Sequence, residues 1–132
     1  MLLVATNVLV DVLQDDPQWA EWSIAQLRAE ASIHELAINA VVYAELSLSF
    51  ATVEALDDVV ATMQLVLREI PRPALFLAGK AFLQYRRRGG SKAQVLPDFF
   101  IGAHAAVQGW PLLTRDASRF RTYFPSVEVI AP

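Results

Sequence analysis

Short apolar runs alternate with helix-forming segments along the whole chain, and this alternation constrains the fold more than any other feature. The predicted strands lie at residues 2–4, 35–38, 67–70, 111–114 and 127–130. Residues typical of helix ends mark the predicted helices between them. Asp16 is expected to cap a helix that starts at Pro17, Asn39 one that starts at about Ala40, and Thr52 one that spans 53–65. Gly89-Gly90 should end a helix over 74–87, and Gly109 should end the helix that starts at Pro97. Such alternation predicts an α/β fold, with three α/β/α layers around a mostly parallel sheet.

The composition predicts a single folded domain spanning residues 1–132. Of the 132 residues 55% are hydrophobic and 19% charged, which excludes a disordered tail and leaves apolar surface for a partner. The absence of cysteine excludes disulfides, thiolate zinc sites and cysteine nucleophiles. Asn7 and Asp11 interrupt the first apolar run, so we expect neither a signal peptide nor a membrane span, and a cytoplasmic location.

Charge is distributed unevenly along the chain. Residues 1–79 hold 11 acidic and 3 basic residues, whereas residues 80–132 hold 3 acidic and 8 basic ones. This asymmetry favours an anionic partner, such as an RNA backbone, for the second half, although each cation is equally explained as a solubilising surface charge. The candidates for RNA binding are Arg86, Arg87, Arg88, Lys92, Arg115, Arg119 and Arg121.

The ends of two predicted strands, at residues 5–7 and 114–116, indicate where a ligand would bind. In parallel sheets ligands bind beyond the carboxyl ends of strands where the winding reverses, so we expect these two turns to be neighbours. Glu45, Asp98 and Asp116 are the candidate acids. Each alone is explained by a solvated helix face, a helix dipole or a helix cap. Together, converging carboxylates predict a bound Mg²⁺ or Mn²⁺, and phosphodiester hydrolysis is the chemistry that such an ion supports.

Four segments in order resemble the successive signatures of a PIN domain, over nearly the whole chain. The size of the chain and the Tyr-Arg-Arg-Arg-Gly-Gly stretch at 85–90 are most similar to the VapC toxins of bacterial and archaeal toxin–antitoxin pairs. The four segments are Leu3-Val4-Ala5-Thr6-Asn7-Val8-Leu9, Ala44-Glu45-Leu46, Leu96-Pro97-Asp98-Phe99-Phe100-Ile101-Gly102-Ala103 and Leu112-Leu113-Thr114-Arg115-Asp116.

The resemblance assigns a role to each candidate site residue. It implies a metal-dependent endoribonuclease that hydrolyses RNA with metal-activated water, with Glu45, Asp98 and Asp116 as metal ligands. Thr114 and Asn7 would support the site through hydrogen bonds to the acids or to bound water. The resemblance further implies a VapB-type antitoxin, a homodimer or toxin–antitoxin hetero-oligomer, and an RNA substrate for which tRNA and rRNA are candidates.

Ala5 departs from the family pattern, because it stands where the first family acid is expected. We favour an engineered aspartate-to-alanine change, since an active ribonuclease toxin poisons its producing cell, over a naturally degenerate homologue. Losing this ligand should sharply reduce turnover. Relief of carboxylate repulsion should also stabilise the metal-free fold.

Two other functions compete with the nuclease interpretation. One is a non-catalytic RNA-binding or protein-binding PIN homologue. The other is a receiver-like signalling module, which would need a phosphoacceptor aspartate after its third strand and a lysine after its fifth, where this chain has Pro71 and Val129-Ile130-Ala131. We expect His34 and His104 to be structural or exposed rather than catalytic, and Phe99 and Phe100 to belong to the core.

Overall fold

The structure is a computed structural model that describes residues 1–92 and 95–132. Strands and helices alternate from the N-terminus, as expected from the sequence. In chain order the elements are β1 (Leu2–Val4), α1 (Thr6–Leu13), α2 (Ala20–Ala31), β2 (Leu36–Ile38), α3 (Ala40–Leu46), the 3-10 turn η1 (Ser47–Ser49), α4 (Val53–Thr62), β3 (Val66–Leu67), α5 (Arg72–Arg87), α6 (Leu96–Gln108), β4 (Leu112–Leu113), α7 (Ser118–Tyr123) and β5 (Val129–Ile130).

The five strands form one parallel sheet in the order β3-β2-β1-β4-β5. The central strand β1 is fully buried, as expected for a strand covered on both faces. Leu3 pairs with Ala37 of β2 on one side and with Leu112 of β4 on the other. The winding reverses between β1 and β4, so a crevice is expected beyond their carboxyl ends.

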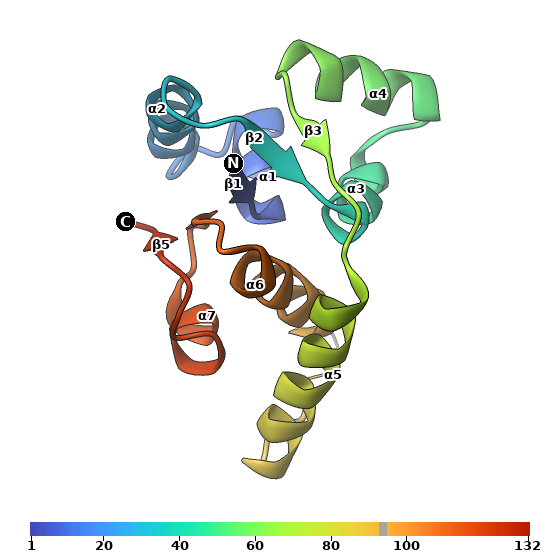
Figure 1. Cartoon of the computed structure of the whole chain (residues 1–132). Coiled ribbons are helices and arrows are strands. Elements are labelled where there is room, and N and C mark those ends of the chain that lie inside the picture. The colour runs from blue at the N-terminus through green and yellow to red at the C-terminus, as the bar shows by residue number, and fades with distance from the viewer. Residues whose placement is uncertain (93–94) are drawn as a thin grey trace.

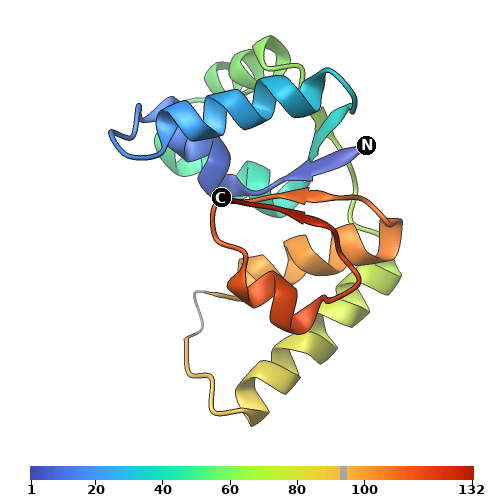
Figure 2. The same ribbon diagram turned by 90° about the vertical axis from the view of Figure 1, so that its left-hand side faces the viewer.

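Helices cover both faces of the sheet, which confirms the predicted α/β/α arrangement. Figure 2 shows α1 and α2 on one side of the sheet and α6 and α7 on the other. α5 packs along α6 and its C-terminal half extends away from the sheet (Figure 1). None of the helices in the described ranges is long and apolar enough to cross a membrane.

The predicted start of the second helix is wrong by three residues. We expected Asp16 to cap a helix beginning at Pro17, but α2 begins at Ala20. The Asp16 Oδ1 atom accepts hydrogen bonds from the backbone N–H groups of Gln18 and Trp19, both at 2.9 Å. These bonds close a local turn, which is the alternative that aspartate offers to a helix cap.

Four other predicted boundaries also need correction. β5 consists of Val129–Ile130 instead of residues 127–130, because the Val127 N–H donates to the Phe124 carbonyl at 3.0 Å in the preceding turn. β3 consists of Val66–Leu67 instead of residues 67–70, because its pairing with β2 ends where the Arg68 N–H donates to the Ile38 carbonyl at 2.8 Å. α4 ends at Thr62, before the predicted 65, because Gln64 has a positive φ of 55° that a helix does not permit. α5 begins at Arg72, two residues before the predicted 74, with proline in its first turn.

Most other predicted helix ends are confirmed. The Asn39 side chain accepts from the N–H groups of Val41 and Val42, and it therefore caps α3. Thr52 caps α4 by accepting from the Ala55 N–H at 3.1 Å. Gly109 ends α6 with a φ of 68°, a conformation that glycine adopts without strain.

Candidate nuclease site

The turns after β1 and β4 are joined by the side chain of Asn7. Its Nδ2 donates to Thr114 Oγ1 at 3.2 Å, and its Oδ1 accepts from the Arg115 N–H at 3.1 Å. This pairing confirms that the two predicted turns are neighbours. Thr114 is fully buried and its hydroxyl accepts from the Asp116 N–H at 3.2 Å. Asn7 and Thr114 thus fix the backbone of the turn, and their expected hydrogen bonds to the acids or to bound water stay a prediction.

A cavity of about 260 Å³ opens beside these turns. Two of the three predicted acids, Glu45 and Asp98, line it together with Ala5. Ala5 is only 3% exposed and directly precedes α1, where its side chain supplies no helix cap. The remaining lining residues are Thr6, Asn7, Val10, Ile101 and Arg115.

Glu45 is held by Thr6, which we did not select from the sequence. The Thr6 Oγ1 donates to Glu45 Oε1 at 2.6 Å across 39 positions of the chain. Glu45 lies near the end of α3, and Asn39 caps the start of that helix. The hydrogen bond therefore fixes the carboxylate relative to the first turn of α1.

Asp98 is paired with Arg119 of α7, and this pair also was not expected. The Arg119 guanidinium donates to Asp98 Oδ2 at 2.7 Å. Burial raises the pKa of Asp98 above its usual value, the Arg119 pair opposes this rise, and the negative charge of Asp116 adds to it. Asp116 is thus close enough to influence Asp98 electrostatically.

Asp116 does not join the other two acids in one cluster. It is exposed, and Ser118 Oγ donates to its Oδ1 at 3.3 Å. Among the described residues, no group of three or more histidine, aspartate or glutamate side chains could hold a metal ion. Each of the three carboxylates has its own hydrogen-bond donor: Thr6 for Glu45, Arg119 for Asp98 and Ser118 for Asp116.

The donor chemistry of the cavity nevertheless suits a hard divalent cation. Carboxylate oxygens are the protein ligands that Mg²⁺ prefers, and one or two of them often suffice when substrate phosphates and water complete the coordination. Glu45 and Asp98 supply two such groups beside Ala5. The position of Ala5 is the place where a third carboxylate would enter the cavity.

His104 is buried in α6 and does not line the cavity. Its Nδ1 lies 3.2 Å from Asn39 Nδ2, which donates to it, and its ring packs against Trp110 with centroids 5.0 Å apart. Nε2 has no hydrogen-bond partner among the described residues. Burial lowers the pKa of His104, so the ring is neutral near pH 7. These contacts agree with the expected structural role.

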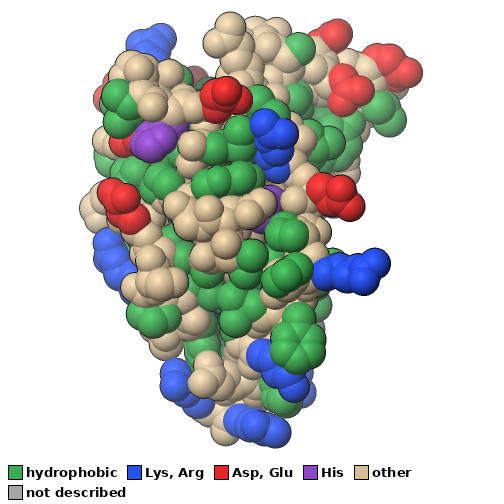
Figure 3. Space-filling model, viewed as in Figure 1, with side chains coloured by type: hydrophobic (Ala, Val, Ile, Leu, Met, Phe, Trp, Pro, Cys, Tyr) green, Lys and Arg blue, Asp and Glu red, His purple; other side chains and the backbone are tan. Residues whose placement is uncertain are grey.

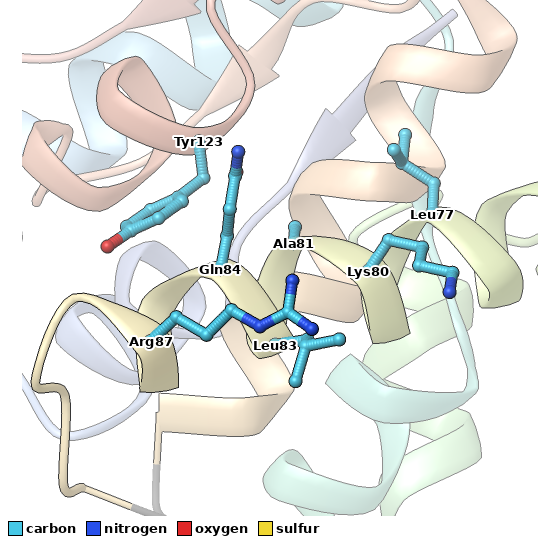
Figure 4. Close-up of a pocket in the computed structure, with 7 residues that line it drawn as sticks. All are labelled: Leu77, Lys80, Ala81, Leu83, Gln84, Arg87 and Tyr123. Carbon is cyan, nitrogen blue, oxygen red and sulfur yellow. The ribbon is translucent and has the colours of Figure 1, made fainter.

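A larger cavity of about 420 Å³ lies along α5 and carries no carboxylate among its lining residues. Figure 4 shows Tyr123 of α7 facing α5 near Gln84, with the cations Lys80 and Arg87 on the same helix. Without an acid this cavity lacks the chemistry for hydrolysis, so the smaller cavity is the candidate site.

The surface repeats the charge asymmetry of the sequence. Acidic side chains gather over α4, which carries Glu54, Asp57 and Asp58, while basic ones gather toward the end of α5 (Figure 3). Phe99 is fully buried and Phe100 packs partly buried against the core, as predicted.

Comparison with known proteins identifies one family and one fold. The family model of the PIN domain matches residues 2–124. No curated protein matches the sequence significantly.

Several solved structures share the fold. A chain in the crystal structure of VapBC2 from Rickettsia felis, bound to a DNA fragment from their promoter, has a TM-score of 0.75 and 19% identity, over 99% of this chain and 98% of that chain. A chain of DNA-bound VapBC from Salmonella typhimurium has a TM-score of 0.71 and 18% identity, over 99% and 98%. A chain of FitAcB from Neisseria gonorrhoeae has a TM-score of 0.66 and 21% identity, over 98% and 96%.

Proposed function

Because the chain belongs to the PIN domain family, we propose that it is a VapC-type endoribonuclease toxin whose activity is impaired by Ala5. The observation that carries the proposal is the cavity that Glu45 and Asp98 line together with Ala5, which follows the end of the central strand. Similar folds in toxin–antitoxin complexes support the assignment to toxins. The reaction is hydrolysis of an RNA phosphodiester bond in the cytoplasm.

Each polar residue at the cavity has its own proposed role. Glu45 and Asp98 would hold Mg²⁺ or Mn²⁺, which supplies an activated water and charge stabilisation at the phosphate. Thr6 orients the Glu45 carboxylate through its 2.6 Å hydrogen bond. In the metal-free chain Arg119 neutralises Asp98, and it must yield at least part of that carboxylate to an ion. Asp116 acts on the site through its charge.

Restoring the missing acid tests the function. We expect Ala5→Asp to cleave RNA in the presence of Mg²⁺ or Mn²⁺, and a chelator to abolish the cleavage. The matched control is Ala5→Asn, which has nearly the same shape without the charge. A second control adds Glu45→Gln to Ala5→Asp and should be inactive. Candidate substrates are total RNA, tRNA and rRNA.

The outcomes separate the nuclease from its principal rival. If Ala5→Asp alone cleaves, the cavity is a nuclease site and Ala5 is its defect. If Ala5→Asp and the present chain are both inactive on every RNA while still binding it, a non-catalytic RNA-binding PIN homologue replaces our proposal. Equal cleavage by Ala5→Asn would show that the activity does not depend on the restored carboxylate.

The proposed partners are a VapB-type antitoxin and a second copy of the chain. Similar folds occur in toxin–antitoxin complexes, some of them bound to DNA. Large exposed apolar side chains on α5, namely Leu75, Phe76 and Leu83, are consistent with a covered surface. Light scattering on the purified chain tests the homodimer, and a monomer at micromolar concentration would contradict it.

A further inference from the structure

Arg115 is fixed at the wall of the candidate site and differs in this respect from a loose surface cation. It directly follows Thr114 at the end of β4 and lines the cavity with Glu45 and Asp98. Its backbone N–H is bound by the Asn7 side chain at 3.1 Å. Its Nε donates to Asp11 Oδ2 at 2.9 Å, across 104 positions of the chain. Both ends of the residue are therefore constrained.

Asp11, the partner of Arg115, carries an almost completely buried carboxylate. It is 2% exposed, and the same Oδ2 atom also accepts from Ser23 Oγ of α2 at 3.0 Å. A buried charge is costly unless it is paired and hydrogen-bonded, and Arg115 and Ser23 supply both conditions. A solubilising arginine would not need such a partner, so the pair indicates that the direction of the guanidinium matters.

Trp19 restrains the guanidinium from another direction. The Arg115 guanidinium carbon lies 5.5 Å from the centroid of the Trp19 ring, which is within the range of a cation–π contact. The Arg115 side chain remains 33% exposed. Within residues 1–92 and 95–132, its two terminal Nη groups make no hydrogen bond. The guanidinium is thus oriented by its Nε hydrogen bond and by the Trp19 ring, while its two Nη groups remain available to a ligand.

The charges of the cavity favour such a cation where a phosphate is to bind. Glu45 and Asp98 repel an anion, and Arg119 is already engaged with Asp98 at 2.7 Å. Among the residues that line the described cavity, Arg115 alone is positively charged. Guanidinium groups bind phosphate oxygens through two parallel N–H donors, a geometry that depends on the orientation of the plane.

We propose that Arg115, oriented by Asp11 and Trp19, binds a phosphodiester group of a single-stranded RNA at the candidate site. Asp11 and Trp19 are positioning residues, since they act through Arg115. The inference rests on the proposed function for the substrate class, and it assigns the residue that holds the RNA backbone independently of the missing acid.

Binding without cleavage tests the inference. The probe is a short fluorescein-labelled 2′-O-methyl RNA strand, which resists hydrolysis, and the readout is fluorescence anisotropy with the present chain in a chelator. We expect Arg115→Gln to weaken binding roughly tenfold, as for loss of a charge-assisted hydrogen-bond pair. The slope of log K against log salt should fall in magnitude by about 0.7 for the lost phosphate contact. The matched control is Arg28→Gln, which removes the same charge from an exposed position of α2, outside the candidate RNA-binding cations, and should change little.

Two further variants separate orientation from net charge. Asp11→Asn makes the protein more positive, so a merely electrostatic surface would bind RNA more tightly, whereas our proposal expects weaker binding. Trp19→Leu leaves the charge unchanged and should weaken binding about two- to fivefold through loss of the cation–π contact. Thermal melting of each variant verifies that it is folded. If Asp11→Asn is not folded, Arg115→Gln and Trp19→Leu provide the test.

Failure of this inference is distinguishable from failure of the proposed function. Equal losses for Arg115→Gln and Arg28→Gln, tighter binding by folded Asp11→Asn, or no RNA binding at low salt would each overturn the role of Arg115. None of these measurements needs a metal or a restored acid. Inactivity of Ala5→Asp would refute the nuclease while leaving an Arg115-dependent RNA contact in place.

Discussion

Replacing Asn39 by alanine should destabilise the protein far more than replacing the other polar helix cap, Thr52. Asn39 is fully buried, accepts from the N–H groups of Val41 and Val42 at 3.1 Å, and donates to His104 Nδ1. Thr52 is exposed and accepts one hydrogen bond. Both residues begin a helix, so the pair isolates the effect of burial and of the histidine contact.

The expected magnitude follows from these contacts. Loss of a helix cap costs about 1 kcal/mol, and an unpaired buried acceptor on His104 adds about 1–3 kcal/mol. Asn39→Ala should therefore lower the free energy of unfolding by roughly 2–4 kcal/mol, against about 0.5–1 kcal/mol for Thr52→Ala. At an unfolding entropy of about 2.1 cal/mol/K per residue, each kcal/mol lowers the Tm of a chain of this length by about 4 °C.

Calorimetry measures the Tm of both variants, and urea unfolding measures their free energy of unfolding. Asn39→Ser keeps a capping oxygen and loses the amide donor, so it should lie between Asn39→Ala and the present chain. Adding Asn39→Ala to Ala5→Asp should lower nuclease activity by more than the loss of folded protein explains, since α3 carries Glu45. An Asn39→Ala loss no larger than that of Thr52→Ala would refute the argument from burial.

Three further outcomes follow from the titratable groups. In a chelator, Ala5→Asp should have a lower Tm than the present chain, because burying a carboxylate beside two others costs more than the roughly 1 kcal/mol gained from the helix cap that it adds. Mn²⁺ should raise the Tm of Ala5→Asp more than it raises the Tm of the present chain. His104 has a lowered pKa in the folded chain, so its contribution to stability is complete above its ordinary pKa of 6.5 and is lost as the pH falls; His104→Gln should remove that part of the stability–pH profile. The raised pKa of Asp98 means that its contribution to stability is present below its ordinary pKa of 3.8 and is lost as the pH rises through the folded value. Arg119→Gln should raise the Asp98 pKa further in a carboxyl NMR titration, and a lower pKa would contradict the assigned ion pair.

The strands and their meeting point could be predicted from the sequence because they depend on local patterns. Runs such as Leu2–Val4 are apolar throughout, as strands covered on both faces must be. The rule for the reversal of winding then placed residues 5–7 beside residues 114–116, and the Asn7–Thr114 hydrogen bond confirms it. The start of α2 was mispredicted because Asp16 can close a turn as readily as it can cap a helix.

The partners of the acids could not be predicted, because they come from distant parts of the chain. Thr6 and Glu45 are 39 positions apart, Asp98 and Arg119 are 21 apart, and Asp11 and Arg115 are 104 apart. The periodicity of the sequence does not indicate which threonine or arginine contacts which carboxylate. The argument that converging carboxylates need a cation overlooked that donors within the protein can bind each acid separately, with a hydroxyl for Glu45 and Asp116 and a guanidinium for Asp98.

The outermost strands of the sheet have a consequence for association with other chains. β3 and β5 have two residues each, so each edge offers an incoming strand a very short ladder of main-chain donors and acceptors. Strand addition, the route by which many sheets recruit peptides or aggregate, is therefore weak at both edges. Assembly with the proposed antitoxin or with a second copy would instead depend on side chains displayed by helices. Partner choice would then be sensitive to single surface substitutions, and the sheet would be protected from unselective growth.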